Sequence, residues 1–138
     1  MGSGYMLTCS NCGYEEELME GRGFLLHEYD LKDFLRERPL PLHHFTLRKM
    51  EQLAGRHDGL RVDMEYKVLK CPFCQIPYSR LYVKVFDGHR MYHETHLQCN
   101  SCKRKLEKAE LSPLEILRCP RCNHLTLKSG MGMDILWD

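Results

Sequence analysis

The stretch that predicts the fold is residues 99–122, CNSC-KRKLEKAELSPLEILR-CPRC, which holds two C-x-x-C motifs. Two cysteines three positions apart on a tight turn can place both sulfurs about 2.3 Å from one ion, and a second such turn completes a tetrahedral shell. The spacing C-x2-C-x16-C-x2-C is usual for such a site. We therefore interpret Cys99, Cys102, Cys119 and Cys122 as ligands of one metal ion.

Two further copies of the motif lie upstream, at Cys9 and Cys12 and at Cys71 and Cys74, so all eight cysteines are used and none is left over. Eight thiolates fill two closed shells, which predicts two structural Zn²⁺ ions. A secreted disulfide framework would show mixed spacings and an export signal, and we find neither. The chain of 138 residues also contains no apolar run long enough for a membrane span. We expect a cytoplasmic protein.

The simplest pairing of the motifs is sequential. Cys9, Cys12, Cys71 and Cys74 would hold the first ion, and the last four cysteines the second. Because 58 residues separate Cys12 from Cys71, residues 20–60 would then be an insertion between the two turns of the first site. The alternative is a cross-brace, in which the first motif pairs with the third and the second with the fourth.

Other uses of the cysteines fit less well. A thioredoxin-type redox pair belongs at the start of a helix after a βα pattern, which is missing here. An iron–sulfur cluster also suits four cysteines and remains a rival. Catalytic zinc is disfavoured, because such sites usually keep an open position beside three protein ligands.

The pattern between the cysteines predicts a small α+β fold. Strands are expected at residues 5–9, 14–19, 62–68 and 125–127, with a hairpin at 79–97 that turns at Asp87-Gly88. Residues 24–60 are expected to be mostly helical. One helix is capped by Asp30 and ended by Pro39, and a second is capped by Thr46, with Phe45 and Met50 as a hydrophobic staple. We divide the chain into 1–97 and 98–138, with the hairpin shared between the two.

The motifs C-x-x-C-G at residues 9–13 and C-P-x-C at 71–74 and 119–122, joined by short hairpins, resemble the zinc ribbons, a rubredoxin-like group that includes small uncharacterised bacterial proteins. The resemblance covers roughly residues 5–19 and 62–128. It implies two tandem four-cysteine ribbons on antiparallel hairpins, with a helical insertion in the first. Gln75 and Lys103 depart from the pattern, because a glycine is common after the second cysteine. Zinc ribbons serve many processes, so the resemblance implies architecture more than function.

The predicted hairpin offers the best candidate surface. With a two-residue turn, Arg80, Tyr82, Lys84 and Phe86 share a face with His89, Met91, His93 and Thr95. Single-stranded bases can stack on a basic and aromatic face of this type. We favour the interpretation that Tyr82, Phe86 and Met91 instead pack beneath the helical insertion, which needs an apolar surface to cover. A second basic cluster, expected around the second zinc, consists of Lys103, Arg104, Lys105, Lys108, Arg118 and Arg121.

No catalytic pattern is visible. His93 and His96 lie three apart, a spacing that points to opposite faces of a strand. His43 and His44 lie in a proline-flanked linker, and His124 is placed to bond a cysteine sulfur. The net charge of +1 is unevenly distributed along the sequence: residues 1–38 carry −4 and residues 39–138 carry +5.

We interpret the chain as a non-catalytic zinc-binding adaptor whose helical insertion contacts a protein partner. The alternative is nucleic-acid binding through the 79–97 hairpin and the basic second turn. We expect no membrane contact, no small-molecule substrate and no enzymatic activity.

Overall fold

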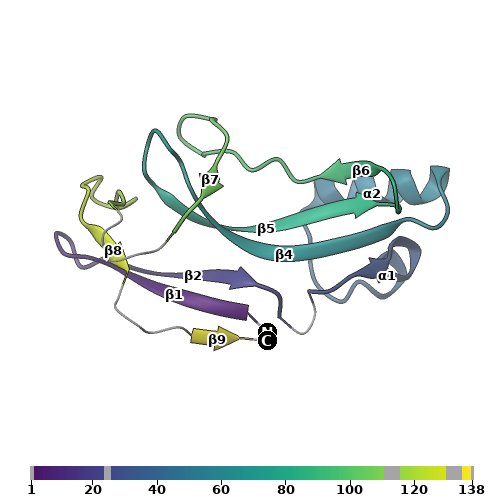
Figure 1. The fold of residues 1–138 in the computed structure, drawn as a ribbon, viewed down its shortest axis with the longest axis horizontal. Helices are drawn as coiled ribbons and strands as arrows, with labels where there is room; N and C mark the ends of the chain where they lie inside the picture. The colour runs from purple at the N-terminus through teal and green to yellow at the C-terminus, as the bar shows by residue number, and fades with distance from the viewer. Residues whose placement is uncertain (1, 24–25, 111–115, 130–134, 138) are drawn as a thin grey trace.

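The computed structural model describes residues 2–23, 26–110, 116–129 and 135–137. Figure 1 shows a small α+β fold in which the two helices gather at one end of a long antiparallel sheet. The elements in chain order are β1 (Gly2–Cys9), β2 (Glu15–Gly21), β3 (Tyr29–Asp30), α1 (Leu31–Glu37), α2 (His44–Arg56), β4 (Arg61–Lys70), β5 (Pro77–Phe86), β6 (Met91–Glu94), β7 (Glu107–Lys108), β8 (Leu127–Ser129) and β9 (Ile135–Trp137).

Two long hairpins form the sheet, β1–β2 and β4–β5, and they meet where Gly21 pairs with Tyr66. The strand order is β6-β5-β4-β2-β1-β8, while β3 and β7 pair with β4 and β9 pairs with β1. Strands from both sides of residue 97 therefore share one sheet. The boundary at that residue stays a prediction.

The alternation of apolar and charged residues explains which side chains of β4 are buried. Val62, Met64 and Val68 are almost fully buried, as their alternation with charged residues predicts. Val62 and Met64 face the helices, whereas Val68 packs further along with Leu7 and Leu18 of the β1–β2 hairpin. Residues on one face of β4 therefore contribute to two separate buried clusters.

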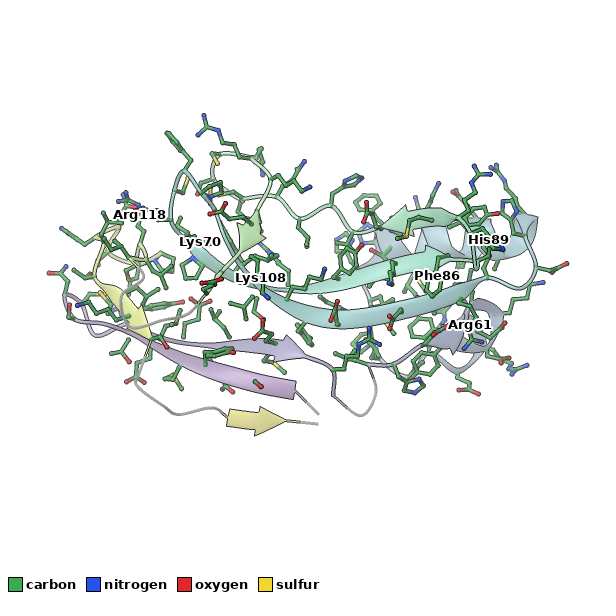
Figure 2. All side chains as sticks on the ribbon, viewed as in Figure 1. Arg61, Lys70, Phe86, His89, Lys108 and Arg118 are labelled. Atoms are coloured by element: carbon green, nitrogen blue, oxygen red, sulfur yellow. The ribbon has the colours of Figure 1, made fainter. Side chains whose placement is uncertain are left out.

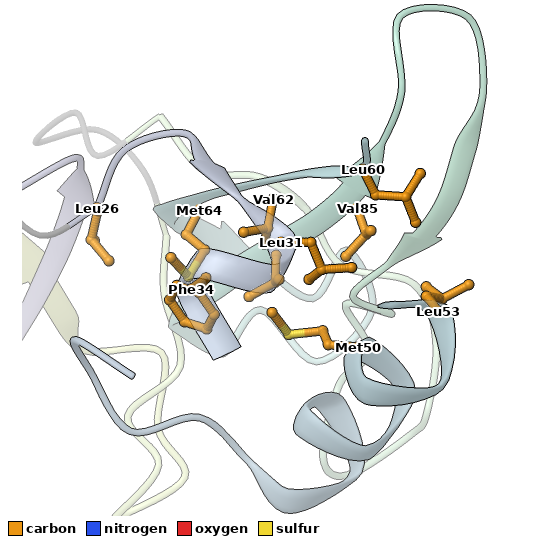
Figure 3. Packing of buried hydrophobic residues seen from close by; sticks show 10 residues of the cluster. Leu26, Leu31, Phe34, Met50, Leu53, Leu60, Val62, Met64 and Val85 are labelled. Carbon is orange, nitrogen blue, oxygen red and sulfur yellow. The ribbon is translucent and has the colours of Figure 1, made fainter. Parts of the chain in front are cut away.

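The helices cover one end of the β4–β5 hairpin (Figure 3). The helix α1 begins at the predicted cap, because the Asp30 carboxylate accepts hydrogen bonds from the N–H groups of Lys32 and Asp33. It ends at Glu37, with Arg38 as its C-cap, before Pro39, as predicted. The core between helices and hairpin, which we call the helical core, contains no cysteine; its buried residues are Leu26, Leu31, Phe34, Met50, Leu53, Leu60, Val62, Met64, Val83 and Val85.

The predicted start of the second helix is wrong. The helix α2 begins at His44, and the ring of His43 caps it by accepting a hydrogen bond from the N–H of Phe45 at 3.4 Å. Thr46 lies inside the helix, so it cannot cap it. Phe45 is 64% exposed while Met50 is buried, so the expected hydrophobic staple does not form.

The helical core supports a stability prediction. Phe34 is fully buried, and its replacement by alanine is expected to lower the free energy of unfolding by about 3–5 kcal/mol, since it removes a ring and leaves a cavity. Phe45→Ala is the matched control, because this ring is largely exposed, and its cost is expected to stay within about 0.5 kcal/mol. Chemical denaturation of the two variants measures both values. Equal costs would mean that Phe34 does not lie in the core.

The hairpin register also differs from the prediction. Asp87 closes a four-residue loop, since its N–H donates to the carbonyl of Arg90 and its carboxylate accepts from the N–H groups of His89 and Arg90. Gly88 does not take the positive φ that the predicted two-residue turn requires. Lys84 consequently pairs with Glu94 and Phe86 with Met91, with an irregularity between Val85 and Phe86. The β6 strand ends at Glu94, short of the predicted residue 97.

Neither helix of the described residues is long and apolar enough to cross a membrane.

Candidate metal centres

The eight cysteines form two groups of four, and the grouping is nested. Within each group the sulfur atoms all lie within 4.8 Å of one another. We call the groups the outer site (Cys9, Cys12, Cys119 and Cys122) and the inner site (Cys71, Cys74, Cys99 and Cys102). The predicted sequential pairing is therefore wrong, and so is the cross-brace alternative. All eight cysteines predicted as ligands are nevertheless brought into these two groups.

Strand pairing explains the nested arrangement. The outer site forms where β1 pairs with β8, with Cys9 opposite Leu127, so the first cysteine turn meets the last. The inner site forms where β7 pairs with the end of β4, with Lys70 opposite Glu107, so the third turn returns to the second. The 16 residues between Cys102 and Cys119 therefore connect the inner site to the outer site, instead of connecting two halves of one site.

All four cysteine turns share one backbone geometry. In each, the N–H of the first cysteine donates to the carbonyl five residues on, and its carbonyl accepts from the N–H four residues on. The residue after the second cysteine is left-handed in every turn: Gly13, Gln75, Lys103 and Asn123 have φ values of 76°, 61°, 63° and 65°. Gln75 and Lys103 take this conformation although they carry a Cβ, so their departure from glycine does not change the turn.

The sulfur separations fit a tetrahedral metal ion. Four sulfurs at about 2.3 Å from one ion lie about 3.8 Å apart. Cys9 and Cys122 are 3.6 Å apart, Cys12 and Cys119 3.7 Å, and Cys71 and Cys102 3.4 Å. The eight cysteines are free of disulfides. Each group can therefore hold one metal ion.

In each site a side-chain hydroxyl contacts a cysteine sulfur, and the sequence analysis did not predict either contact. The Thr126 hydroxyl lies 3.0 Å from the sulfur of Cys9, and the Tyr78 hydroxyl lies 3.3 Å from that of Cys99. Each of these residues follows the second cysteine of a C-P-x-C turn by four positions, and each reaches the first cysteine of the opposite turn. This spacing, visible in the sequence, could have identified both contacts.

Thiol pKa values reflect this crowding. Burial raises the pKa of Cys99, but hydrogen bonds from the Tyr78 hydroxyl and from the backbone of Cys102 outweigh it and bring the pKa to about 6. The pKa of Cys74 rises to about 12, through burial and through the neighbouring thiols. Four thiols within a few ångströms cannot all ionise without a compensating cation, and a divalent ion supplies that charge.

His124 contacts the outer site, as predicted. A hydrogen bond between the side chains of His124 and Cys122 raises the pKa of the imidazole. The Asn11 amide bonds the same thiol, lowering the pKa of Cys122 to about 5, and lies 3.3 Å from His124 Nδ1. These partners orient a ligand and favour its thiolate form.

Arg118 connects the two sites. Its backbone N–H donates to the carbonyl of Gln75 at 2.8 Å, its Nε to that of Cys74 at 2.9 Å, and its Nη1 to that of Asn123 at 2.8 Å. The outer and inner sites are thus tied through one half-buried guanidinium. Figure 2 places Arg118 at the cysteine-bearing end of the molecule, away from Phe86 and His89.

This geometry predicts that Arg118→Lys lowers the free energy of unfolding of the metal-loaded chain by about 1–3 kcal/mol, because an ammonium group cannot reproduce the planar fork. Chelator competition should then remove both ions faster. Arg121→Lys, an exposed arginine inside a turn of the outer site, is the matched control and should be neutral. If the two variants behave alike, Arg118 does not couple the sites.

The predicted hairpin surface is only partly assembled. Arg80, Tyr82, Lys84 and Phe86 do share one face of β5, but the irregular register puts Glu94, rather than His93, beside Tyr82. The helices cover the opposite face, through Val83 and Val85, so the prediction that Tyr82 and Phe86 pack beneath them is wrong. Met91 is 47% exposed and does not pack there either.

The second basic cluster is split between the sites. Lys103, Arg104 and Lys105 follow the third cysteine turn at the inner site, and Lys108 lies in β7 beside it. Arg118 and Arg121 belong to the fourth turn at the outer site. Figure 2 shows Arg118 and Phe86 at opposite ends of the molecule, so the predicted residues do not form a single surface.

Within the described ranges, the two cysteine groups are the only clusters of three or more metal-ligating side chains at binding distance, and no histidine joins them as a ligand. Comparison of the chain with models of protein families, with curated proteins and with solved structures finds no significant match.

Proposed function

We propose that each cysteine group holds a structural Zn²⁺ ion, in a zinc-ribbon-like site, and that the chain acts as a non-catalytic adaptor for another protein. The observation that carries the proposal is the closed shell of four cysteine sulfurs in each group. Four thiolates leave no position on the metal for water or substrate, whereas catalytic zinc sites keep one open.

The sulfur spacing favours a single ion over an iron–sulfur cluster. In a [4Fe–4S] cluster each thiolate binds a different iron, and in a [2Fe–2S] cluster each iron takes two, so at least some of the four sulfurs lie further apart than ligands of one ion; here all four sulfurs of each group lie within 4.8 Å of one another. The closest pairs here are 3.4–3.7 Å apart, the spacing of a tetrahedral shell. Reduced thiols at both sites fit the reducing compartment, the cytoplasm, that we propose.

The candidate partner surface that we propose lies at the cysteine-bearing end, in place of the helical insertion suggested by the sequence. Phe73 is 67% exposed, Ile116 58% and Leu125 46%. Phe73 and Leu125 each stand within two residues of a carbonyl that accepts a hydrogen bond from Arg118, and Ile116 stands two residues before Arg118; we call these three residues the metal-end surface. The guanidinium of Arg104 lies 3.9 Å from the centre of the Phe73 ring. Exposed aromatic and apolar side chains next to arginine are typical of protein interfaces and suit a partner with apolar and acidic groups.

The test is photo-crosslinking in the source cell, with a photoreactive residue placed at position 73, 125 or 45 in three separate variants. We expect positions 73 and 125 to capture the same protein, and position 45 to capture none, because Phe45 is exposed on α2, away from the cysteine turns. Capture of nucleic acid at position 73, or of no molecule there, would contradict the adaptor proposal.

Nucleic-acid binding remains the second candidate, because cations and aromatic rings alternate along β5. The rings are already covered, however: Lys67 Nζ lies 4.0 Å from the centre of the Tyr82 ring, and the Tyr82 hydroxyl donates to Glu94 at 2.6 Å. Fluorescence anisotropy with a labelled single-stranded oligonucleotide at low and high salt tests this function. Salt-sensitive binding that Lys84→Gln weakens would favour it over the adaptor.

A further inference from the structure

A cleft of about 440 Å³ lies at the edge of β5, beside the inner site. The β6 strand pairs only with Lys84–Phe86, and among the described residues the last backbone hydrogen bond from the returning chain to β5 is that of Thr95 with Val83. Beyond them the chain runs alongside β5 toward Cys99 (Figure 1). The linker before α2 closes the cleft through Pro41, Leu42 and His43. Its volume falls within the range of small-molecule sites.

The lining of the cleft is basic. Arg80, Lys103, His43 and His96 all line it, and no acidic residue does. Neither Arg80 nor Lys103 forms an ion pair with a carboxylate in the part of the chain that the structure describes. The residue opposite Arg80 on β4 is Lys67, another cation. Cys99 of the inner site also lines the cleft; the Arg80 and Lys103 cations in this concave site favour an anionic ligand.

Contacts within the protein already fix the orientation of the Arg80 guanidinium. Its Nη2 donates to the side-chain oxygen of Asn100 at 2.9 Å, and its guanidinium lies 4.8 Å from the centre of the Tyr78 ring. Tyr78 is itself fixed by its hydroxyl contact with Cys99. An arginine whose orientation is set before binding loses little entropy when it pairs with an oxyanion.

The rest of the lining suits the body of an organic molecule. Leu42, Leu81, Val83 and Leu97 give an apolar wall. The N–H and carbonyl of Val83 bond Thr95, so by the alternation of a strand those of Leu81 are directed to the same open edge. The cleft therefore combines an anion-binding rim, an apolar wall and a strand edge.

We propose that this cleft binds a small organic phosphate monoester, with the phosphate between Arg80 and Lys103 and an apolar or aromatic body against Leu81 and Leu97. A dianionic phosphate is favoured over a carboxylate because two permanent cations are available to it. The site is separate from the metal-end surface and does not depend on the adaptor role. The proposal differs from the sequence analysis, which expected no small-molecule substrate.

The test is a titration of the zinc-loaded chain with phenyl phosphate, followed by amide chemical shifts. We expect saturable binding in the millimolar range or tighter, with the largest shifts at Leu81, Thr95 and Lys103. Inorganic phosphate should bind more weakly, because it lacks the apolar body, and benzyl alcohol should not bind. Scattered shifts that do not saturate would overturn the proposal.

Two variants locate the site. Arg80→Gln and Lys103→Gln should each weaken phenyl phosphate binding about tenfold, since each removes a charged partner of the phosphate. Glutamine is safe at position 103, because Gln75 holds the same left-handed conformation in another turn. Lys84→Gln, further along β5 and outside the cleft, should leave affinity unchanged. If the two cleft variants lose zinc while binding is unaffected, the cations serve the inner site and the proposal is wrong.

Discussion

Removal of the two zinc ions that we propose is expected to unfold the cysteine-bearing end of the molecule while the helical core keeps most of its structure. Two of the three buried clusters among the described residues contain cysteines: Leu7, Leu18 and Leu127 pack with Cys9 and Cys119, and Leu69 and Leu106 pack with Cys71 and Cys99. The helical core has none. Zinc held by four thiolates contributes about 10–16 kcal/mol in peptide systems, and its loss removes that energy only where the ligands are.

Hydrogen exchange before and after treatment with a strong chelator measures this effect. Amides of Leu7, Leu18 and Leu69 should lose protection, whereas those of Val62, Val85 and Met50 should keep the greater part of it. A native circular dichroism spectrum after both ions have been stripped would mean that the metals are not structural. Equal loss at every amide would mean that the helical core does not fold independently of them.

The second large effect concerns which cysteines suffice for one site. A variant that keeps only Cys71, Cys74, Cys99 and Cys102, with serine at the other four positions, is expected to bind one zinc ion, because it retains the whole inner site. A matched variant that keeps only the last four cysteines retains half of each site. It should bind none at native affinity, since two thiolates leave the shell incomplete.

These two variants distinguish all three pairings. Sequential pairing predicts the reverse result, with zinc only in the variant that keeps the last four cysteines. A cross-brace predicts no native-affinity site in either variant, because each would hold two halves. Native mass spectrometry counts the bound ions directly.

Local rules predicted much of the fold. The Asp30 cap, the end of α1 before Pro39 and the alternating burial of β4 all follow from nearest neighbours in the sequence, and the structure confirms them. The errors at α2 and at the β5–β6 turn arose where a different side chain bonds the backbone from the one expected, or where a side chain supports a longer loop. His43 caps in place of Thr46, and Asp87 closes a longer loop.

The pairing of the cysteines could not be predicted in the same way, because it depends on strands far apart in the chain. Each site combines one C-P-x-C turn with one turn whose middle residues are serine and asparagine, CSNC in the outer site and CNSC in the inner. That pattern excludes a cross-brace, but sequential and nested pairing both satisfy it. The pairings of β8 with β1 and of β7 with β4 decide between them, and short strands of two or three residues give little signal in a sequence.

The central claim, that eight thiolates form two closed zinc sites, is tested most directly by the metal content of the purified chain. Elemental analysis against protein concentration should give two zinc ions per chain and negligible iron, because each group of four sulfurs fills one tetrahedral shell. A value near one zinc ion per chain, or substantial iron, would contradict the claim.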